Sequence, residues 1–324
     1  MESFDVVAVG DAFVDAFLSI HNPTEVCSYD ETTEKLSLHA GAKILVDECD
    51  FMLGGNSCNV AVGLSRLGLK TALVAELGDD EFAQKIHHGL EKEHVSLDFA
   101  KITQGEASTF SMGIQVQGER TLFVHHVNRK HDLPLEGLTT KWIYLSSMGL
   151  EWQPMYERVL SFVKEQNIKL AFNPGSQQMK DGYESFKNVV SVCDILFVNR
   201  DEAEEMLYGK LRDAQEKESA ESLLFRLQRM GPKMIVLTDG LNGSYFLDGG
   251  NIITSQPTIL AEKPLGKTGA GDAYASGFLG AVLLGKDIKE AMKWGAHNSR
   301  AVVEHIGAQT NLLTKEEMER RIQE

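Results

Sequence analysis

The chain has few cysteines and no apolar run long enough to cross a membrane. Its 324 residues include 4 cysteines, at 27, 49, 58 and 193, without a C-x-x-C pair. This spacing argues against a disulfide framework and against a zinc site. No stretch approaches the ~18 apolar residues that a membrane span needs, and the N-terminus lacks a basic segment followed by an apolar one. We therefore expect a cytoplasmic protein with reduced thiols and no membrane contact.

Basic residues are outnumbered by acidic ones. The chain has 32 Lys and Arg against 47 Asp and Glu, which gives a formal net charge of −15. Such a charge repels nucleic acid and anionic membranes, so we expect no nucleic-acid partner. An anionic substrate would have to be held by a local pocket.

Strand-like and helical patterns alternate along the chain, which predicts an α/β fold with a mostly parallel central sheet and helices on both faces. The expected strands are 6–9, 71–75, 142–145, 170–172, 195–198 and 234–237, with a later one, not necessarily parallel, at 244–247. The expected helices are 58–67, 81–93, 155–166, 202–207, 220–230, 273–284 and 288–304, and 314–317 fits a capping box that opens a last helix. In such a sheet, ligands bind beyond the carboxyl ends of the strands.

Two segments, about 12–53 and 108–126, have strand-like patterns that interrupt this alternation. In the second segment, Gly118 and Glu119 fit a hairpin turn. Because both segments leave and rejoin the sheet, we interpret them as a small β lid over its carboxyl edge; surface decoration is the alternative. The sequence has no internal repeat or linker, so we expect residues 1–324 to form a single domain with this lid.

A glycine-rich stretch at 266–278 leads into the helical pattern 273–284. The start of such a helix binds anions, because its free N–H groups and its dipole point at the ligand. Gly269 and Gly271 place no side chain in the way. Asp272 stands at the mouth of this turn, where a carboxylate can accept the proton of an attacking hydroxyl. On this stretch alone, a simple helix-capping role for Asp272 is an equal alternative.

Two further places carry residues suited to a hydroxylated substrate. Gly54 and Gly55 precede an apolar helix, and Asn59 in its first turn can donate to a hydroxyl and accept from one. Asp15 follows the first strand, where a carboxylate can accept from two neighbouring hydroxyls. A glycine turn with an Asn cap and a solvated surface acid are the alternatives.

Polar residues also follow later strands. Asn199 and Glu202 come after the strand 195–198 and offer oxygen ligands for hydrated Mg²⁺ near phosphates, although acidic residues also favour helix N-termini in their own right. Arg129, after the second lid strand, could reach a charged group of a substrate or belong to a solvated basic loop.

Together these motifs resemble the two signatures of the PfkB family of carbohydrate kinases, which have the ribokinase-like fold. The residues similar to the first signature are Gly54-Gly55 with Asn59, Ala61, Gly68 and Gly78. Those similar to the second are Thr268-Gly269-Ala270-Gly271-Asp272 with Ser276-Gly277. The two motifs follow one another in the family's order, with Asn199-x-x-Glu202 between them.

The resemblance implies a role for each matching residue. Asp272 would be the catalytic base, and the amides of Gly269, Ala270 and Gly271 would bind the transferring phosphoryl group. The residues that would hold substrate hydroxyls are Asp15, Gly54, Gly55 and Asn59. Those that would line the nucleotide site are Asn199, Glu202, Thr238, Gly240, Thr268, His297 and Asn298, with Glu202 holding Mg²⁺ through water.

The sequence departs from the family pattern at two places. Gly266-Lys267 stands where many members have Asp-Thr, which puts activation by a monovalent cation in doubt. Phe13 stands two residues before Asp15, where ribokinases have an Asn that contacts the sugar. An aromatic ring there leaves room for a nucleoside or another sugar to stack.

We therefore predict an ATP-dependent kinase that phosphorylates a primary hydroxyl of a sugar or sugar derivative. A nucleoside kinase on the same scaffold is the first alternative, and a non-catalytic sugar-binding protein is the second. The resemblance also makes a homodimer that pairs through the lids plausible.

Overall fold

The computed structural model describes residues 3–22, 24–33, 35–116, 119–209 and 218–323, and a nine-stranded sheet forms its centre. In sheet order the strands are β17 (Ile253–Gln256), β16 (Ser244–Leu247), β15 (Met234–Thr238), β14 (Ile195–Asn199), β13 (Lys169–Phe172), β12 (Thr139–Leu145), β1 (Ser3–Val9), β6 (Thr71–Val74) and β8 (Val95–Ser96). The strands from β15 to β8 run parallel, whereas β16 pairs antiparallel with both β15 and β17. The expected mostly parallel sheet is confirmed.

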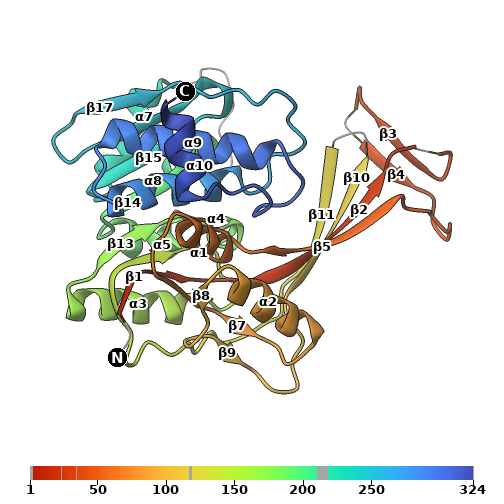
Figure 1. Ribbon diagram of the computed structural model, residues 1–324, viewed down its shortest axis with the longest axis horizontal. Coiled ribbons are helices and arrows are strands. Elements are labelled where there is room, and N and C mark those ends of the chain that lie inside the picture. The colour runs from red at the N-terminus through yellow and green to blue at the C-terminus, as the bar shows by residue number, and fades with distance from the viewer. Residues whose placement is uncertain (1–2, 23, 34, 117–118, 210–217, 324) are drawn as a thin grey trace.

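Helices cover both faces of this sheet (Figure 1), as the alternation of buried side chains along its strands requires. In β12, for example, Ile143 and Leu145 belong to one core, and Trp142 and Tyr144 belong to the other. The helices of the first core are α3 (Gln153–Gln166), α4 (Ser176–Asp181), α5 (Tyr183–Val190), α6 (Arg200–Tyr208) and α7 (Ala220–Gln228). Those of the second are α1 (Asn56–Arg66), α8 (Ala270–Leu283), α9 (Ile288–Val303) and α10 (Lys315–Gln323), and α2 (Glu81–Lys92) packs beside β6 and β8. None of the helices in the described ranges is long and apolar enough to span a membrane.

A second sheet, called the small sheet below, extends away from the helices (Figure 1). Its strands lie in the order β11 (Glu119–His125), β10 (Phe110–Val116), β2 (Phe13–Ile20) and β5 (Glu48–Gly54). The segments 12–53 and 108–126 supply all four strands, and Gly118 of the expected hairpin turn lies outside the described residues. Two smaller pairs are β3 (Cys27–Asp30) with β4 (Lys35–Leu38) and β7 (Glu76–Leu77) with β9 (Lys101–Ile102).

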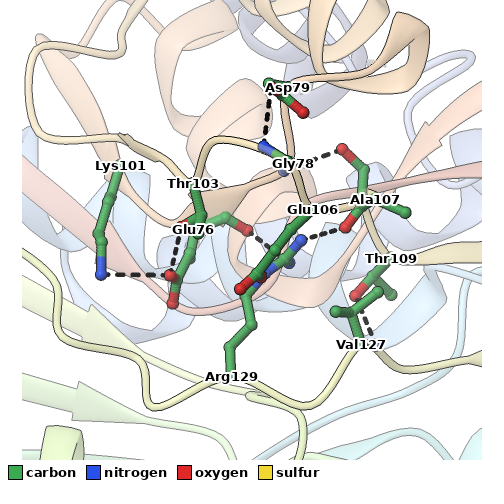
Figure 2. A network of polar contacts seen from close by, with 12 residues as sticks. Glu76, Gly78, Asp79, Lys101, Thr103, Glu106, Ala107, Thr109, Val127 and Arg129 are labelled. Atoms are coloured by element: carbon green, nitrogen blue, oxygen red, sulfur yellow. Dashed lines mark hydrogen bonds and ion pairs between the residues drawn. The ribbon is translucent and has the colours of Figure 1, made fainter.

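A polar network around the buried Arg129 lies where the chain leaves β11 (Figure 2). Arg129 is 6% exposed, and its Nε donates to Glu106 Oε2 at 3.0 Å. The same guanidinium donates to the main-chain oxygens of Ala107 and Glu76. Since Ala107 leads into β10, Arg129 connects the ends of two strands of the small sheet. The interpretation of Arg129 as a solvated basic residue is wrong.

Candidate active site

The site is built where the first turns of α1 and α8 come together. The two helices pack closely because glycines leave room for the facing side chains: a Cβ at Gly63 would lie 2.4 Å from Ser276 Oγ, and one at Gly280 would lie 2.5 Å from Leu67 Cδ1. Both helices therefore present their N-terminal ends at the carboxyl edge of the large sheet. Helix dipoles make such ends favourable for negative charge.

Asp272 lies in the first turn of α8 and is 8% exposed. Its Oδ2 accepts a hydrogen bond from Asn59 Nδ2 at 2.8 Å. Burial raises the pKa of Asp272 to about 7; the hydrogen bond from Asn59 opposes this rise, and the charge of Glu202 adds to it. Asp272 does not cap the helix, because the N-cap residue of α8 is Gly269 and no side chain bonds there. A carboxyl group with a pKa near neutrality suits a general base.

The turn before Asp272 requires its glycines for different reasons. Gly269 has φ +79°, and a Cβ there would lie 2.5 Å from the Cβ of Ala308. Gly271 faces open space, because a Cβ added there would have no heavy atom within 4 Å. The amide of Ala270, expected to bind the phosphoryl group, donates instead to the main-chain oxygen of Lys267 at 3.2 Å. Gly269 and Gly271 thus line the cavity, whereas the amide of Ala270 is used within the turn itself.

A cavity of about 210 Å³ opens in front of this turn. Its lining brings together six of the residues singled out in the sequence: Asn199, Glu202, Thr238, Gly269, Gly271 and Asp272. Carboxylates therefore enter it from two helices, α6 and α8. Phe197, Val198 and Val236 supply the apolar part of its wall.

Asn199 and Glu202 also form the capping box of α6. Asn199 Oδ1 accepts from the amide of Glu202, and Glu202 Oε2 accepts from the amide of Asn199, both at 2.9 Å. Burial raises the pKa of Glu202 to about 7. The capping role, which the sequence left as an alternative, is thus present, and the side chain still reaches the cavity.

The residues expected at the acceptor side lie beside this cavity rather than in its lining. Asp15 is 7% exposed and accepts a hydrogen bond from Ser111 Oγ. A Cβ at Gly54 would lie 2.3 Å from Asp15 Oδ2 and 2.8 Å from the ring of Phe13. Gly55 has φ +99°, and a Cβ there would lie 2.3 Å from the main-chain oxygen of Asp11. The two glycines therefore allow β2 and the start of α1 to approach each other.

The other expected nucleotide-site residues are dispersed. His297 lines a second cavity of about 480 Å³ between α9, α10 and the end of β17, where Lys293 and Arg300 also lie. Gly240 accepts a hydrogen bond from Thr258 Oγ1 at 2.5 Å through its main-chain oxygen. Thr268 is half-buried and lines neither cavity.

Asn298 is fully buried and lies among helices rather than at a ligand site. Its Nδ2 donates to the main-chain oxygen of Ala273 and to Ser276 Oγ, and its Oδ1 accepts from the amide of Leu313. These bonds fasten α8 to α9 and to the loop that follows. The expectation that Asn298 contacts the nucleotide does not fit this position.

A comparison with known families decides the class of protein. Residues 23–315 match the model of the pfkB family of carbohydrate kinases. The chain belongs to this family. It is therefore a phosphotransferase that acts on hydroxyl groups of sugar-type substrates, as the sequence predicted.

Individual relatives are similar over most of their length. A protein of Archaeoglobus fulgidus described as an uncharacterized sugar kinase is 28% identical over 269 residues, which are 78% of this chain and 98% of that protein. A nucleoside kinase of Methanothermobacter thermautotrophicus is 27% identical over 269 residues, with coverage of 80% and 81%. The structure of Arabidopsis thaliana ribokinase complexed with ribose and ATP superposes with a TM-score of 0.78 over 98% of both chains, at 18% identity. The ribokinase-like fold is thereby confirmed.

For this pfkB kinase, the structure adds residues to which the sequence reasoning assigned no role. Asn56, Asn173 and Tyr274 line the cavity of about 210 Å³. Asn173 was detectable, because it directly follows an expected strand. Gln309, whose Nε2 donates to Asn59 Oδ1 at 2.9 Å, had no recognisable signal, since it lies in a loop outside both motifs.

Proposed function

We propose that this chain is an ATP-dependent kinase that phosphorylates a primary hydroxyl of a neutral sugar or sugar derivative. The observation that carries the proposal is the position of Asp272, which is buried, bonded to Asn59 and adjacent to the cavity lined by Gly269 and Gly271. A base and an anion-binding helix end thus share one opening, which is the pair of functions that phosphoryl transfer needs.

In the proposed reaction, Asp272 accepts the proton of the acceptor hydroxyl as its oxygen attacks the terminal phosphorus. The amides at Gly269 and Gly271 and the N-terminal end of α8 stabilise the charge of the transferred group. Asp15 accepts hydrogen bonds from other hydroxyls of the acceptor. Gly54 and Gly55 have no side chain that would collide with Asp15 or with the main chain before β2. Asn59 holds the carboxylate of Asp272 through its amide N–H.

Glu202 and Asn199 would hold Mg²⁺, with water between the ion and the Glu202 carboxylate. The donor set fits, because Mg²⁺ prefers oxygen ligands and keeps several waters. When bound, the ion supplies positive charge to the phosphates of the donor.

The rest of ATP would extend along the edge of the large sheet. Thr238 lines the cavity beside Glu202. Gly240 and Thr268, which line neither cavity, would contact the phosphates and ribose beyond it. The adenine base of ATP would lie in the cavity of about 480 Å³ beside His297. Its lining includes Arg300, Arg320 and Arg321, whose guanidinium planes can stack on a purine.

We further propose that residues 1–324 act as a single domain in which the small sheet serves as a lid over the acceptor. A lid excludes water, which would otherwise compete as phosphoryl acceptor. Its exposed apolar side chains, among them Phe51, Leu122 and Phe123, suit pairing with a second copy into a homodimer.

Charge favours a neutral acceptor. Asp15 and Asp272 stand at the acceptor side, and both carboxylates repel anions. Arg129, which follows the lid strand β11, is buried and paired with Glu106. A carboxylate or phosphate on the acceptor would therefore face like charges, without help from this cation.

A substrate panel tests the proposal. ADP release is measured with pentoses, hexoses, nucleosides, sugar acids and sugar phosphates, each with ATP and Mg²⁺. We expect turnover with one or more neutral sugars. Turnover with nucleosides would favour the alternative acceptor, which the ring of Phe13 beside Gly54 supports. No ADP release across the panel would favour a sugar-binding protein without activity.

A further inference from the structure

A chain of hydrogen bonds leads from Asp272 to a loop that neither signature motif includes. Asn59 has one donor group and one acceptor oxygen, and the structure uses both. Its Nδ2 donates to Asp272 Oδ2 at 2.8 Å, and its Oδ1 accepts from Gln309 Nε2 at 2.9 Å. The second N–H of Gln309 points to Cys58 Sγ at 3.3 Å.

These bonds determine which end of the Asn59 amide faces the carboxylate. A carboxylate can only accept, so Asn59 must turn its NH₂ toward Asp272 and its oxygen away. That oxygen is buried, and it needs a donor on the far side. Gln309 supplies the donor, and the bond from Gln309 Nε2 to Cys58 keeps the NH₂ of Gln309 in this direction.

The loop that carries Gln309 is itself anchored. Arg66, at the end of α1, donates through its NH1 to the main-chain oxygens of Gln309 and Leu312 at 3.0 and 2.9 Å. Glu93 binds the same guanidinium through two bonds, from Nε at 2.8 Å and from NH2 at 2.7 Å. A bidentate pair of this kind fixes direction as well as charge.

We infer that Gln309 is a positioning residue for phosphoryl transfer: by fixing the amide of Asn59, it keeps a hydrogen-bond donor on the carboxylate of Asp272. This inference rests on the proposed function, in which Asp272 is the base. Without Gln309, Asn59 can rotate its oxygen toward Asp272, and the ionised carboxylate loses its donor. Asp272 is then protonated at pH values at which it is ionised in the unaltered protein.

The pKa values of other titratable groups near Asp272 should not respond to the loss of Gln309 in the same way. Burial raises the pKa of Cys58 to about 12 and that of Tyr144 well above its ordinary value, so both stay protonated in a neutral buffer. Glu202 on α6 also has a raised pKa, but its carboxylate accepts from the amide of Asn199 rather than from Asn59. A substitution at Gln309 should therefore shift the pKa of Asp272 rather than that of Glu202.

The test compares the pH profile of kcat/KM for the full chain and two variants, with the neutral sugar and ATP that the panel identifies. Gln309→Met keeps the length of the side chain and removes the donor, whereas Gln309→Glu replaces the donor by an acceptor. For Gln309→Met we expect the acid limb to move up by about one pH unit, which lowers kcat/KM about fivefold at pH 7 and less than about twofold at pH ~9.5. Gln309→Glu should move the acid limb of the profile further toward high pH.

Controls separate this result from a merely structural role. Gln228→Met removes a similar side chain on α7, far from the site, and should leave the profile unchanged. Arg66→Lys leaves Gln309 in place but loosens its loop, and should shift the limb by a smaller amount; it serves if the Gln309 variants do not fold. An equal loss of kcat/KM at every pH, or an unchanged acid limb, would overturn the inference. Absence of turnover in the unaltered enzyme would instead refute the proposed function.

Discussion

Replacing Asp272 by Asn should abolish catalysis and at the same time stabilise the protein. Asn has nearly the same shape as Asp, and its side-chain oxygen can still accept from Asn59. The variant therefore removes charge and basicity with little change in packing. Loss of a general base lowers the rate by ~10²–10⁴-fold, so turnover should fall at least to this extent while ATP still binds.

The stability gain follows from the raised pKa of Asp272. The folded protein holds a proton on this group up to pH about 7, whereas the unfolded chain loses it near the ordinary value of 3.8. Stability of the unaltered protein therefore decreases as pH rises across this interval. The difference between the two values corresponds to about 4 kcal/mol, which is an upper limit for the gain at pH ~8.

Urea denaturation at pH ~4 and at pH ~8 measures this gain. We expect the two proteins to have the same free energy of unfolding at the lower pH and the Asp272→Asn variant to be more stable at the higher pH. The reasoning is refuted if turnover stays near normal. It is also refuted if the variant is no more stable at the higher pH, because the ionised carboxylate of Asp272 would then not destabilise the folded protein.

Three further changes test other parts of the site. Gly271→Ala places a methyl group in the open space before α8, and should lower kcat by about tenfold or more in initial-rate assays while the melting temperature changes little. His297→Ala should raise KM for ATP by about threefold to tenfold with kcat unchanged, since it removes a contact to the adenine base. An unchanged KM for ATP would show that His297 is not part of the nucleotide site. Phe123→Lys should convert a dimer to a monomer in light scattering, and a variant that stays dimeric would exclude pairing through β11.

Much of the fold could be predicted because its signals are local. Periodicity identified six of the seven parallel strands in the described residues, all except the two-residue β8. The capping box at Thr314 and Glu317 opens α10 as expected. Helices α4 and α5 were not predicted. Each is short, at 6 and 8 residues, and Gly182 separates them, so neither presents a full amphipathic repeat. Strand β17, which was also missed, is short and lies at the sheet edge.

The candidate site was harder to predict where it depends on distant residues. Motif spacing pointed to Asp272 and to Asn59, but their mutual hydrogen bond arises from the packing of α1 on α8. The same packing buries Asn298, which the resemblance to the family placed near the nucleotide. Gln309 lies in a loop that Arg66 holds through the main-chain oxygen of Gln309. This contact joins residues far apart in sequence, and no local pattern reveals it.

The most direct test of the account is a crystal structure of the enzyme with its accepted sugar and a non-hydrolysable ATP analogue. We expect a hydroxyl of the sugar within about 2.6–3.2 Å of the Asp272 carboxylate, with the terminal phosphate against Gly269 and Gly271. A sugar whose hydroxyls all lie beyond hydrogen-bond reach of Asp272, with the phosphate bound elsewhere, would contradict the central claim.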